Sequence, residues 1–200
     1  MEILLIRHGK TRGNLEGRYI GRTDEPLLDA SREVLQQSPY RDFDPDVIYV
    51  SPMRRCRETA EILFGDGCHC KLSGMIIDKD LREMDFGDFE NKNYDDLKSE
   101  PVYQTWIDVG GRFAFPGGED PIAFRRRCQE AFWKDIEDAV RESFEKVAFV
   151  VHGGTIMSIM EAYGTPKGDF YRWQVKNGEG YHCIVVKTEG TIILMEKETS

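Results

Sequence analysis

The chain has few long apolar runs and a deficit of basic residues. Near its N-terminus only four consecutive apolar residues, 3–6, precede Arg7, which is too short for a signal peptide or a membrane-spanning helix. Lys and Arg number 27 against 36 Asp and Glu, a net charge of −9 at pH 7. Nucleic-acid binders carry a broad basic patch. We therefore expect a cytoplasmic protein with neither nucleic acid nor membrane as a partner.

Cysteine is also scarce. Five residues, an odd number scattered along the chain, predict reduced thiols rather than a disulfide framework. The one cluster is Cys68-His69-Cys70. Its donors are adjacent rather than spaced by two to four residues, and no second pair follows to complete four ligands. We expect a surface turn there and no metal site.

Short apolar runs rich in β-branched residues occur at 3–6, 47–50 and 147–151. Such runs predict strands buried on both faces, as in a parallel sheet covered by helices. Two later runs, 181–186 and 191–196, predict a hairpin joined across residues 188–190. Because the sequence has no linker, low-complexity tract or repeat, we expect a single domain over residues 1–200.

Between these strands, residues 52–64, 121–144 and 156–163 are predicted to be helices, the longest of them from apolar residues spaced three or four positions apart. Asp120 is placed to cap the second helix and Thr155 to cap the third. This order of elements predicts an α/β fold, a three-layer sandwich with a mainly parallel central sheet and helices on both faces.

Two of the predicted strands end in histidine followed by glycine: His8-Gly9 and His152-Gly153. Open α/β sheets place their ligand crevices at the carboxyl ends of strands. If the two strands are neighbours, the imidazoles face each other. A lone histidine at a strand end is more often structural, but a matched pair favours function.

Three arginines, Arg54, Arg55 and Arg57, open the helix that follows the second strand. Free N–H groups at a helix N-terminus and guanidinium groups both bind oxyanions. We expect Arg54 and Arg57 to be solvated and Arg55 to point inward, because an exposed helix face cannot easily hold all three.

The acidic stretch 80–90 contains Glu83, which alternation places beside apolar neighbours. Burial disfavours the charged form of a carboxyl group, so Glu83 is a candidate general acid. Ordinary solvated surface is the alternative for this stretch, and Asp85 is the alternative acid.

Together these residues resemble the histidine phosphatase superfamily, also called phosphoglycerate mutase-like. Four motifs in the family's order carry the resemblance: Leu-Ile-Arg-His-Gly-Lys-Thr-Arg-Gly-Asn at 5–14, Ser-Pro-Met-Arg-Arg at 51–55, Leu-Arg-Glu at 81–83 and His-Gly-Gly-Thr at 152–155. Within the superfamily, stretches 17–27, 83–90 and 115–119 are most similar to the α-ribazole-5′-phosphate phosphatases of cobalamin nucleotide-loop assembly.

The resemblance implies a phosphomonoesterase that acts through a phosphohistidine. His8 would be the nucleophile, and Glu83 would protonate the leaving alkoxide and then deprotonate the attacking water. Positive charge from arginine and histidine would stand in for a metal, so no metal or cofactor is expected.

The resemblance also implies a set of groups around the phosphoryl oxygens. They are Arg7, Arg55 and His152, with Asn14 and the Gly153 amide; Gly21 is a further candidate for binding substrate. The expected partner is a small phosphoester, and a homodimer is left open.

A small cap-like insertion is expected around residues 91–119. Its aromatic residues could stack on a flat base in the substrate or could equally pack a small core of their own; they are Tyr103, Trp106, Phe113 and Phe115.

Two departures bear on the activity. Mutase members usually carry Thr where this chain has Ile20, and they tend to be longer; both favour a phosphatase. The alternatives are a phosphoglycerate mutase, a broad-specificity sugar phosphatase and, more remotely, a non-catalytic phospholigand-binding protein.

Overall fold

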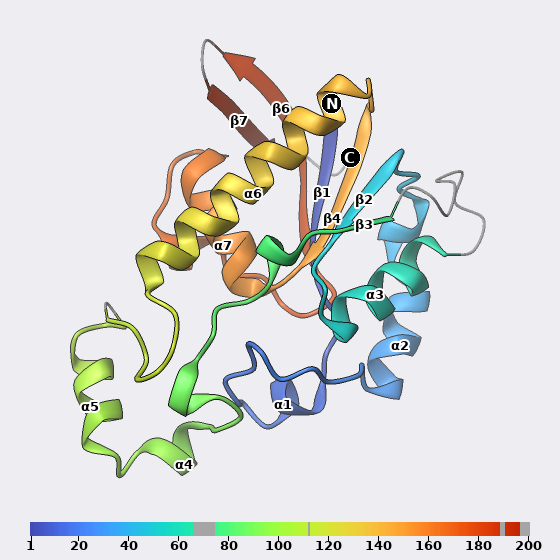
Figure 1. Ribbon diagram of the computed structural model, residues 1–200. Helices are drawn as coiled ribbons and strands as arrows, with labels where there is room; N and C mark the ends of the chain where they lie inside the picture. The colour runs from blue at the N-terminus through green and yellow to red at the C-terminus, as the bar shows by residue number, and fades with distance from the viewer. Residues whose placement is uncertain (66–74, 112, 189–190, 197–200) are drawn as a thin grey trace.

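The apolar runs form the centre of a seven-stranded mixed sheet. The computed structural model describes residues 1–65, 75–111, 113–188 and 191–196 (Figure 1). The strand order is β3-β2-β4-β1-β6-β7-β5. Among these strands β6 alone runs against the others, since its pairings with β1 and β7 are antiparallel and the rest are parallel. The strands are β1 (Glu2–Arg7), β2 (Val47–Val50), β3 (Met75–Ile77), β4 (Lys146–Val151), β5 (Gly164–Thr165), β6 (Gly180–Thr188) and β7 (Thr191–Glu196).

Helices cover both faces of this sheet, as the sequence predicts. In Figure 1, α6 and α7 lie across one face and α2 and α3 across the other, which makes three layers. The α-helices are α1 (Arg12–Leu15), α2 (Asp29–Gln36), α3 (Arg54–Phe64), α4 (Tyr94–Leu97), α5 (Pro101–Asp108), α6 (Pro121–Arg141) and α7 (Gly153–Tyr163). Short 3₁₀ turns are Pro39–Asp42, Lys79–Leu81, Gly87–Phe89 and Phe170–Trp173.

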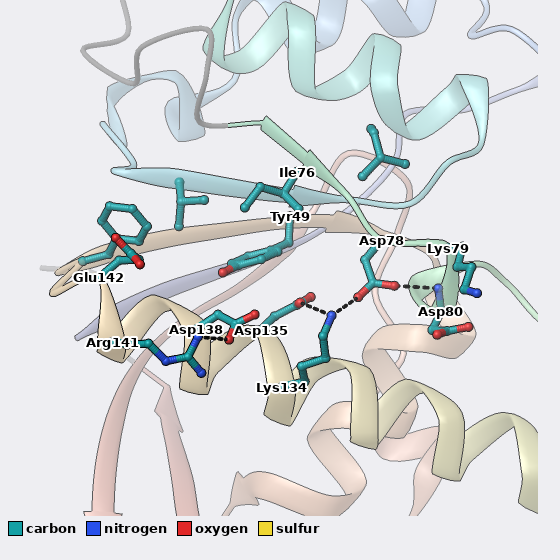
Figure 2. Close-up of a pocket in the computed structure, with 13 residues that line it drawn as sticks. Tyr49, Ile76, Asp78, Lys79, Asp80, Lys134, Asp135, Asp138, Arg141 and Glu142 are labelled. Atoms are coloured by element: carbon teal, nitrogen blue, oxygen red, sulfur yellow. Dashed lines mark hydrogen bonds and ion pairs between the residues drawn. The ribbon is translucent and has the colours of Figure 1, made fainter.

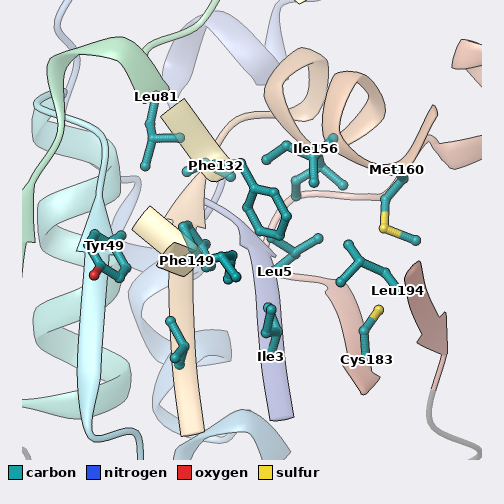
Figure 3. Packing of buried hydrophobic residues seen from close by; sticks show 14 of the residues in the cluster. Ile3, Leu5, Tyr49, Leu81, Phe132, Phe149, Ile156, Met160, Cys183 and Leu194 are labelled. Atoms are coloured by element: carbon teal, nitrogen blue, oxygen red, sulfur yellow. The ribbon is translucent and has the colours of Figure 1, made fainter. Parts of the chain in front are cut away.

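Alternate residues of each central strand serve different cores. In β1, Ile3 and Leu5 pack under α6 and α7 (Figure 3), whereas Leu4 and Ile6 pack under α2 and α3. Each of these side chains is fully buried, and burial of one such side chain contributes about 1.5–3 kcal/mol. Strands with two buried faces therefore appear in the sequence as continuous apolar runs rather than alternating ones.

The boundaries of two predicted helices were wrong. Helix α6 ends at Arg141 rather than near Phe144, because Ser143 adopts a left-handed backbone conformation with φ of 60°. Helix α7 begins at Gly153 with His152 as its N-cap, so Thr155 lies inside the helix and does not cap it. The predicted cap of α6 is confirmed: the Asp120 side chain accepts bonds from two amides of the first turn.

A third, aromatic cluster lies outside the two main cores. It contains Phe89, Leu97, Tyr103 and Phe115. The segment with α4 and α5 extends below the sheet in Figure 1, on the side where β1 ends. It includes much of the insertion expected over residues 91–119.

The thiols in the described part of the chain agree with the prediction of reduced cysteines. Cys56, Cys128 and Cys183 are buried, and Cys56 and Cys128 are free thiols. Cys68-His69-Cys70 lies outside the described residues. Across the residues described, no group of three or more His, Cys, Asp or Glu side chains is arranged to hold a metal ion. Helices long and apolar enough to cross a membrane are likewise absent from these residues.

Candidate active site

The two histidines at strand ends face each other. Strands β1 and β4 are parallel neighbours, with Arg7 opposite Val151. His8 and His152 directly follow these two paired residues, so they lie side by side at the ends of the strands. Their ring centroids are 5.2 Å apart in an edge-to-face arrangement, and both residues are buried.

His8 is held as a neutral imidazole with one free nitrogen. Its Nδ1 lies 2.6 Å from the carbonyl oxygen of Gly9. A carbonyl can only accept, so Nδ1 carries the proton and Nε2 keeps its lone pair. Burial, followed by the charges of Arg55 and Arg7, holds the pKa of His8 well below its ordinary value. His8 therefore has the protonation state that a nucleophile requires.

Two arginines lie beside it, the buried Arg55 and the partly buried Arg7. Arg55 is fully buried, and its Nη atoms donate to the carbonyl oxygens of residues 20, 21 and 23. Arg54 and Arg57 are exposed, as expected. The Nη1 of Arg7 donates to the carbonyl oxygen of Val175 at 2.8 Å. The Nε atoms of Arg7 and Arg55 are both buried and have no hydrogen-bond partner among the described residues. Buried donors without partners are rare, and they point to an oxyanion as the missing acceptor.

The N-terminus of α7 brings Gly153 and Gly154 into the same site. A Cβ on Gly153 would lie 3.3 Å from the Nε of Arg7, so the glycine lets the helix approach the guanidinium group closely. Helix α7 begins three residues earlier than predicted, and this places the Gly153 amide in its first turn, beside Arg7.

Glu83 lies beside this helix start. Its Oε2 accepts from the Gly154 amide and its Oε1 from the Met84 amide, both at 3.0 Å. Burial raises the pKa of Glu83, and these bonds with the charges of Arg7 and Arg55 oppose the rise without cancelling it. The carboxyl group therefore holds a proton at higher pH than an exposed glutamate, as expected of a general acid.

Asn14 is oriented by a residue that sequence reasoning missed. The Oδ1 of Asn14 accepts from the amide and hydroxyl of Thr11 and from the Nδ2 of Asn177. The same Nδ2 also contacts the carbonyl oxygen of His8, at 3.1 Å. With its oxygen occupied, Asn14 keeps its NH₂ group as a donor. An isolated asparagine in a loop carries no sequence signal that would reveal Asn177.

Gly21 contacts Arg55, and both its carbonyl oxygen and its amide form hydrogen bonds. Its carbonyl oxygen accepts from Arg55 at 2.9 Å. Its amide donates to the carboxylate of Glu90, which also accepts from the Thr23 amide. A Cβ at position 21 would clash with the carbonyl oxygen of Met84. Contact of Gly21 with substrate therefore stays a prediction, while its contact with Arg55 is direct.

A cavity of about 400 Å³ opens beside Arg7, Glu83 and Gly153. Its volume is in the range of small-molecule sites. Aromatic rings form much of its wall: Tyr19, Phe86, Trp106, Phe115, Phe124, Phe170 and Tyr171.

The structure tests only the packing interpretation of the aromatic insertion, and stacking on a substrate base stays a prediction. Tyr103 is buried in the aromatic cluster, as the packing alternative predicts. Trp106 and Phe115 stack with centroids 4.5 Å apart and also line the cavity. Phe113 does neither, since its side chain is 64% exposed.

A larger cavity, about 720 Å³, lies between β2, β3 and α6 and contains none of the predicted site residues. Figure 2 shows the Lys134 ammonium group between Asp78 and Asp135, at 3.7 and 4.0 Å. Burial, then the charge of Asp78, raises the pKa of Asp135 to about 8. The fold therefore favours the protonated form of this carboxyl group. The described residues that line this cavity include no histidine and no buried arginine.

The family model of the histidine phosphatase superfamily (branch 1) matches residues 3–197. The chain belongs to this superfamily. It is 28% identical over 183 residues to the adenosylcobalamin/alpha-ribazole phosphatase of Escherichia coli K12, covering 89% of this chain and 87% of the relative. It is 30% identical over 171 residues to phosphoglycerate mutase-like protein 4 of Arabidopsis thaliana, covering 80% and 70%.

Among solved structures, the alpha-ribazole phosphatase of Shigella flexneri superposes with a TM-score of 0.80 at 25% identity, covering 98% of this chain and 95% of that one. The predicted α/β fold is thereby confirmed for this member of the histidine phosphatase superfamily.

Proposed function

We propose that the protein is a phosphomonoester hydrolase that acts through a phosphohistidine on His8. The observation that carries the proposal is an unprotonated His8 Nε2 beside two buried arginine Nε–H groups that have no partner among the described residues. A nucleophile beside unpaired donors fits a phosphoryl group, whose three equatorial oxygens carry the transition-state charge.

The reaction has two displacements at phosphorus. In the first, His8 Nε2 forms the P–N bond as the P–O bond to the leaving group breaks, and Glu83 gives its proton to the leaving oxygen. In the second, Glu83 takes a proton from water, whose oxygen forms a new P–O bond as the P–N bond breaks. Phosphate, the alcohol and the starting enzyme result.

Arginine and histidine hold the transferred group during both steps. Arg7, Arg55, His152, the Asn14 NH₂ group and the Gly153 amide would donate to its oxygens. The guanidinium groups are rigidly placed by backbone carbonyls, so little reorganisation is needed as charge develops.

The substrate we propose is α-ribazole 5′-phosphate. Two findings support it: the cavity beside Glu83 is lined by aromatic rings that suit a flat base, and two of the relatives described above bear the name alpha-ribazole phosphatase. The segment with α4 and α5 would serve as the cap over this cavity.

The decisive experiment measures phosphate release from α-ribazole 5′-phosphate, 3-phosphoglycerate and sugar phosphates, with His8→Ala as the control. Rapid release from the first substrate, lost in His8→Ala while the fold is retained, is expected. Conversion of 3-phosphoglycerate without net phosphate release would make the protein a mutase instead. Tight phosphate binding with no turnover of any substrate would make it a binding protein.

A further inference from the structure

Ser51 is a buried hydroxyl that the proposed reaction does not use. It follows β2 directly, and its Oγ lies 2.7 Å from the Nε2 of His152. Both residues are fully buried. The Ser-Pro motif of the sequence carries the resemblance to the superfamily but by itself says nothing about this contact.

The sheet sets the distance between these two side chains. Strands β2 and β4 are parallel neighbours with Val50 opposite Val150, and the Ser51 amide extends the ladder by donating to the Val150 carbonyl at 3.2 Å. Ser51 and His152 are therefore the residues just beyond the ends of adjacent strands. Their backbones cannot separate without breaking the central sheet, so the hydroxyl is held against the imidazole.

The surroundings decide which atom donates. If Nε2 carried the proton and donated to Ser51, the buried hydroxyl proton would have no oxygen or nitrogen acceptor among the hydrogen bonds of the described residues. A buried donor without an acceptor costs roughly 1–3 kcal/mol. If Ser51 donates to Nε2, the hydroxyl is satisfied and the imidazole proton lies on Nδ1.

The neighbouring thiol of Cys56 also interacts with the Ser51 side chain. Sulfur is a much weaker acceptor than an imidazole nitrogen, so it does not change this assignment. Cys56 Sγ lies 3.5 Å from Nε2 and 3.8 Å from Nδ1 of His152. Burial raises the pKa of Cys56 to about 12, so it is a neutral thiol and only a weak partner. Its better acceptor is the carbonyl oxygen of Val151, at 3.5 Å.

We propose that Ser51 is a positioning residue that fixes the tautomer of His152, so that the Nδ1–H group is the one offered to a phosphoryl oxygen. The link to catalysis rests on the proposed function, whereas the tautomer itself does not. Without Ser51, the imidazole could carry its proton on either nitrogen, and part of the population would present a lone pair to the oxyanion.

Long-range ¹H–¹⁵N correlation spectra of the histidine-labelled protein test the tautomer directly. The chain has four histidines, so His152 is assigned by comparison with His152→Gln. A protonated Nδ1 and an unprotonated Nε2 are expected, with mixed or reversed protonation in Ser51→Ala. A protonated Nε2 in the unaltered protein, or an unchanged pattern in Ser51→Ala, would overturn the proposal.

Cys56→Ala is the matched control, because it removes the other side chain that contacts the same ring. It should leave the tautomer unchanged; an equal change there would mean that packing sets the tautomer, against the proposal. Thermal unfolding establishes that each variant is folded.

Kinetics extend the test to the proposed reaction. In Ser51→Ala we expect kcat to fall about ten- to hundredfold, less than the loss of a direct oxyanion donor, with partial rescue in Ser51→Thr, which keeps the hydroxyl. An undiminished kcat would contradict the positioning role. If the unaltered protein hydrolyses no phosphomonoester, the proposed function fails, while the spectra still decide the tautomer.

Discussion

The carboxylate of Glu83 and the amide of Gly154 form a 3.0 Å hydrogen bond between residues 71 positions apart in the chain. A Cβ on Gly154 would lie 2.3 Å from the other carboxylate oxygen of Glu83. The absence of a side chain at the start of α7 therefore leaves the space that the candidate general acid occupies.

Gly154→Ala should displace Glu83 while the sheet and α7 stay formed. Because the carboxyl group must move away from the leaving oxygen, we expect kcat to fall about tenfold or more. Steady-state kinetics with an alkyl phosphate, alongside circular dichroism, measure this. Unchanged kcat in a folded variant would remove the steric argument.

Glu83→Gln should affect substrates according to their leaving groups. An amide cannot give a proton to an alkoxide, whereas p-nitrophenolate needs little protonation to depart. We expect turnover of an alkyl phosphate to fall far more than turnover of p-nitrophenyl phosphate. Equal slowing of the two would assign the acid role elsewhere, with Asp85 as the next variant to make.

Asn177→Ala should weaken phosphate binding without abolishing turnover. It removes the group that contacts both the Asn14 side chain and the His8 carbonyl, so only Thr11 still holds the Asn14 side chain and its orientation is less firmly set. A several-fold rise in the inhibition constant of inorganic phosphate is expected, since one oriented hydrogen bond is worth about 1 kcal/mol. Lys176→Ala is the control, because Lys176 is an exposed neighbour. If both variants bind phosphate equally well, Asn177 does not act on Asn14.

Asp135→Asn should change how stability depends on pH. The pKa of Asp135 is raised from 3.8 to about 8 in the fold by burial and by Asp78. The fold favours the protonated carboxyl, so its stabilising contribution is complete below about pH 4 and is lost as the pH rises towards about 8. An asparagine side chain does not titrate. The free energy of unfolding of the variant should therefore fall less over that interval than that of the unaltered protein, by up to a few kcal/mol. Urea unfolding at pH 5 and pH 8 measures the difference. Parallel pH profiles of the two proteins would contradict the raised pKa.

Much of the site was predictable because its main residues follow strands that the sequence marks clearly. His8 and His152 come directly after buried apolar runs, and parallel neighbours bring such positions together. Arg55 was separable from Arg54 and Arg57 because a helix has only one inward face. Spacing alone marked Glu83 only weakly, since solvated surface was the alternative for its stretch, and the resemblance to the superfamily singled it out.

Other parts had no signal in the sequence. The carbonyl oxygen of Val175 that holds Arg7 belongs to a loop, and any residue supplies a backbone carbonyl. The start of α7 was predicted wrongly because threonine is a favoured N-cap residue. In the structure the chain passes directly from β4 into the helix, and His152 is the N-cap. The preference of threonine for the N-cap position was outweighed there by the position of the end of β4, after which the helix begins with Gly153 and Gly154.

The sequence by itself determined the α/β class, the ends of the central strands and the superfamily, since these depend on apolar runs and motifs that are contiguous in the chain. Only the tertiary structure decided that Ser51 bonds to His152, that Asn177 bonds to Asn14 and that, within the part of the chain described, both arginine Nε groups lack partners. Those relationships join residues far apart in sequence, so they exist only once the sheet has set the strands side by side.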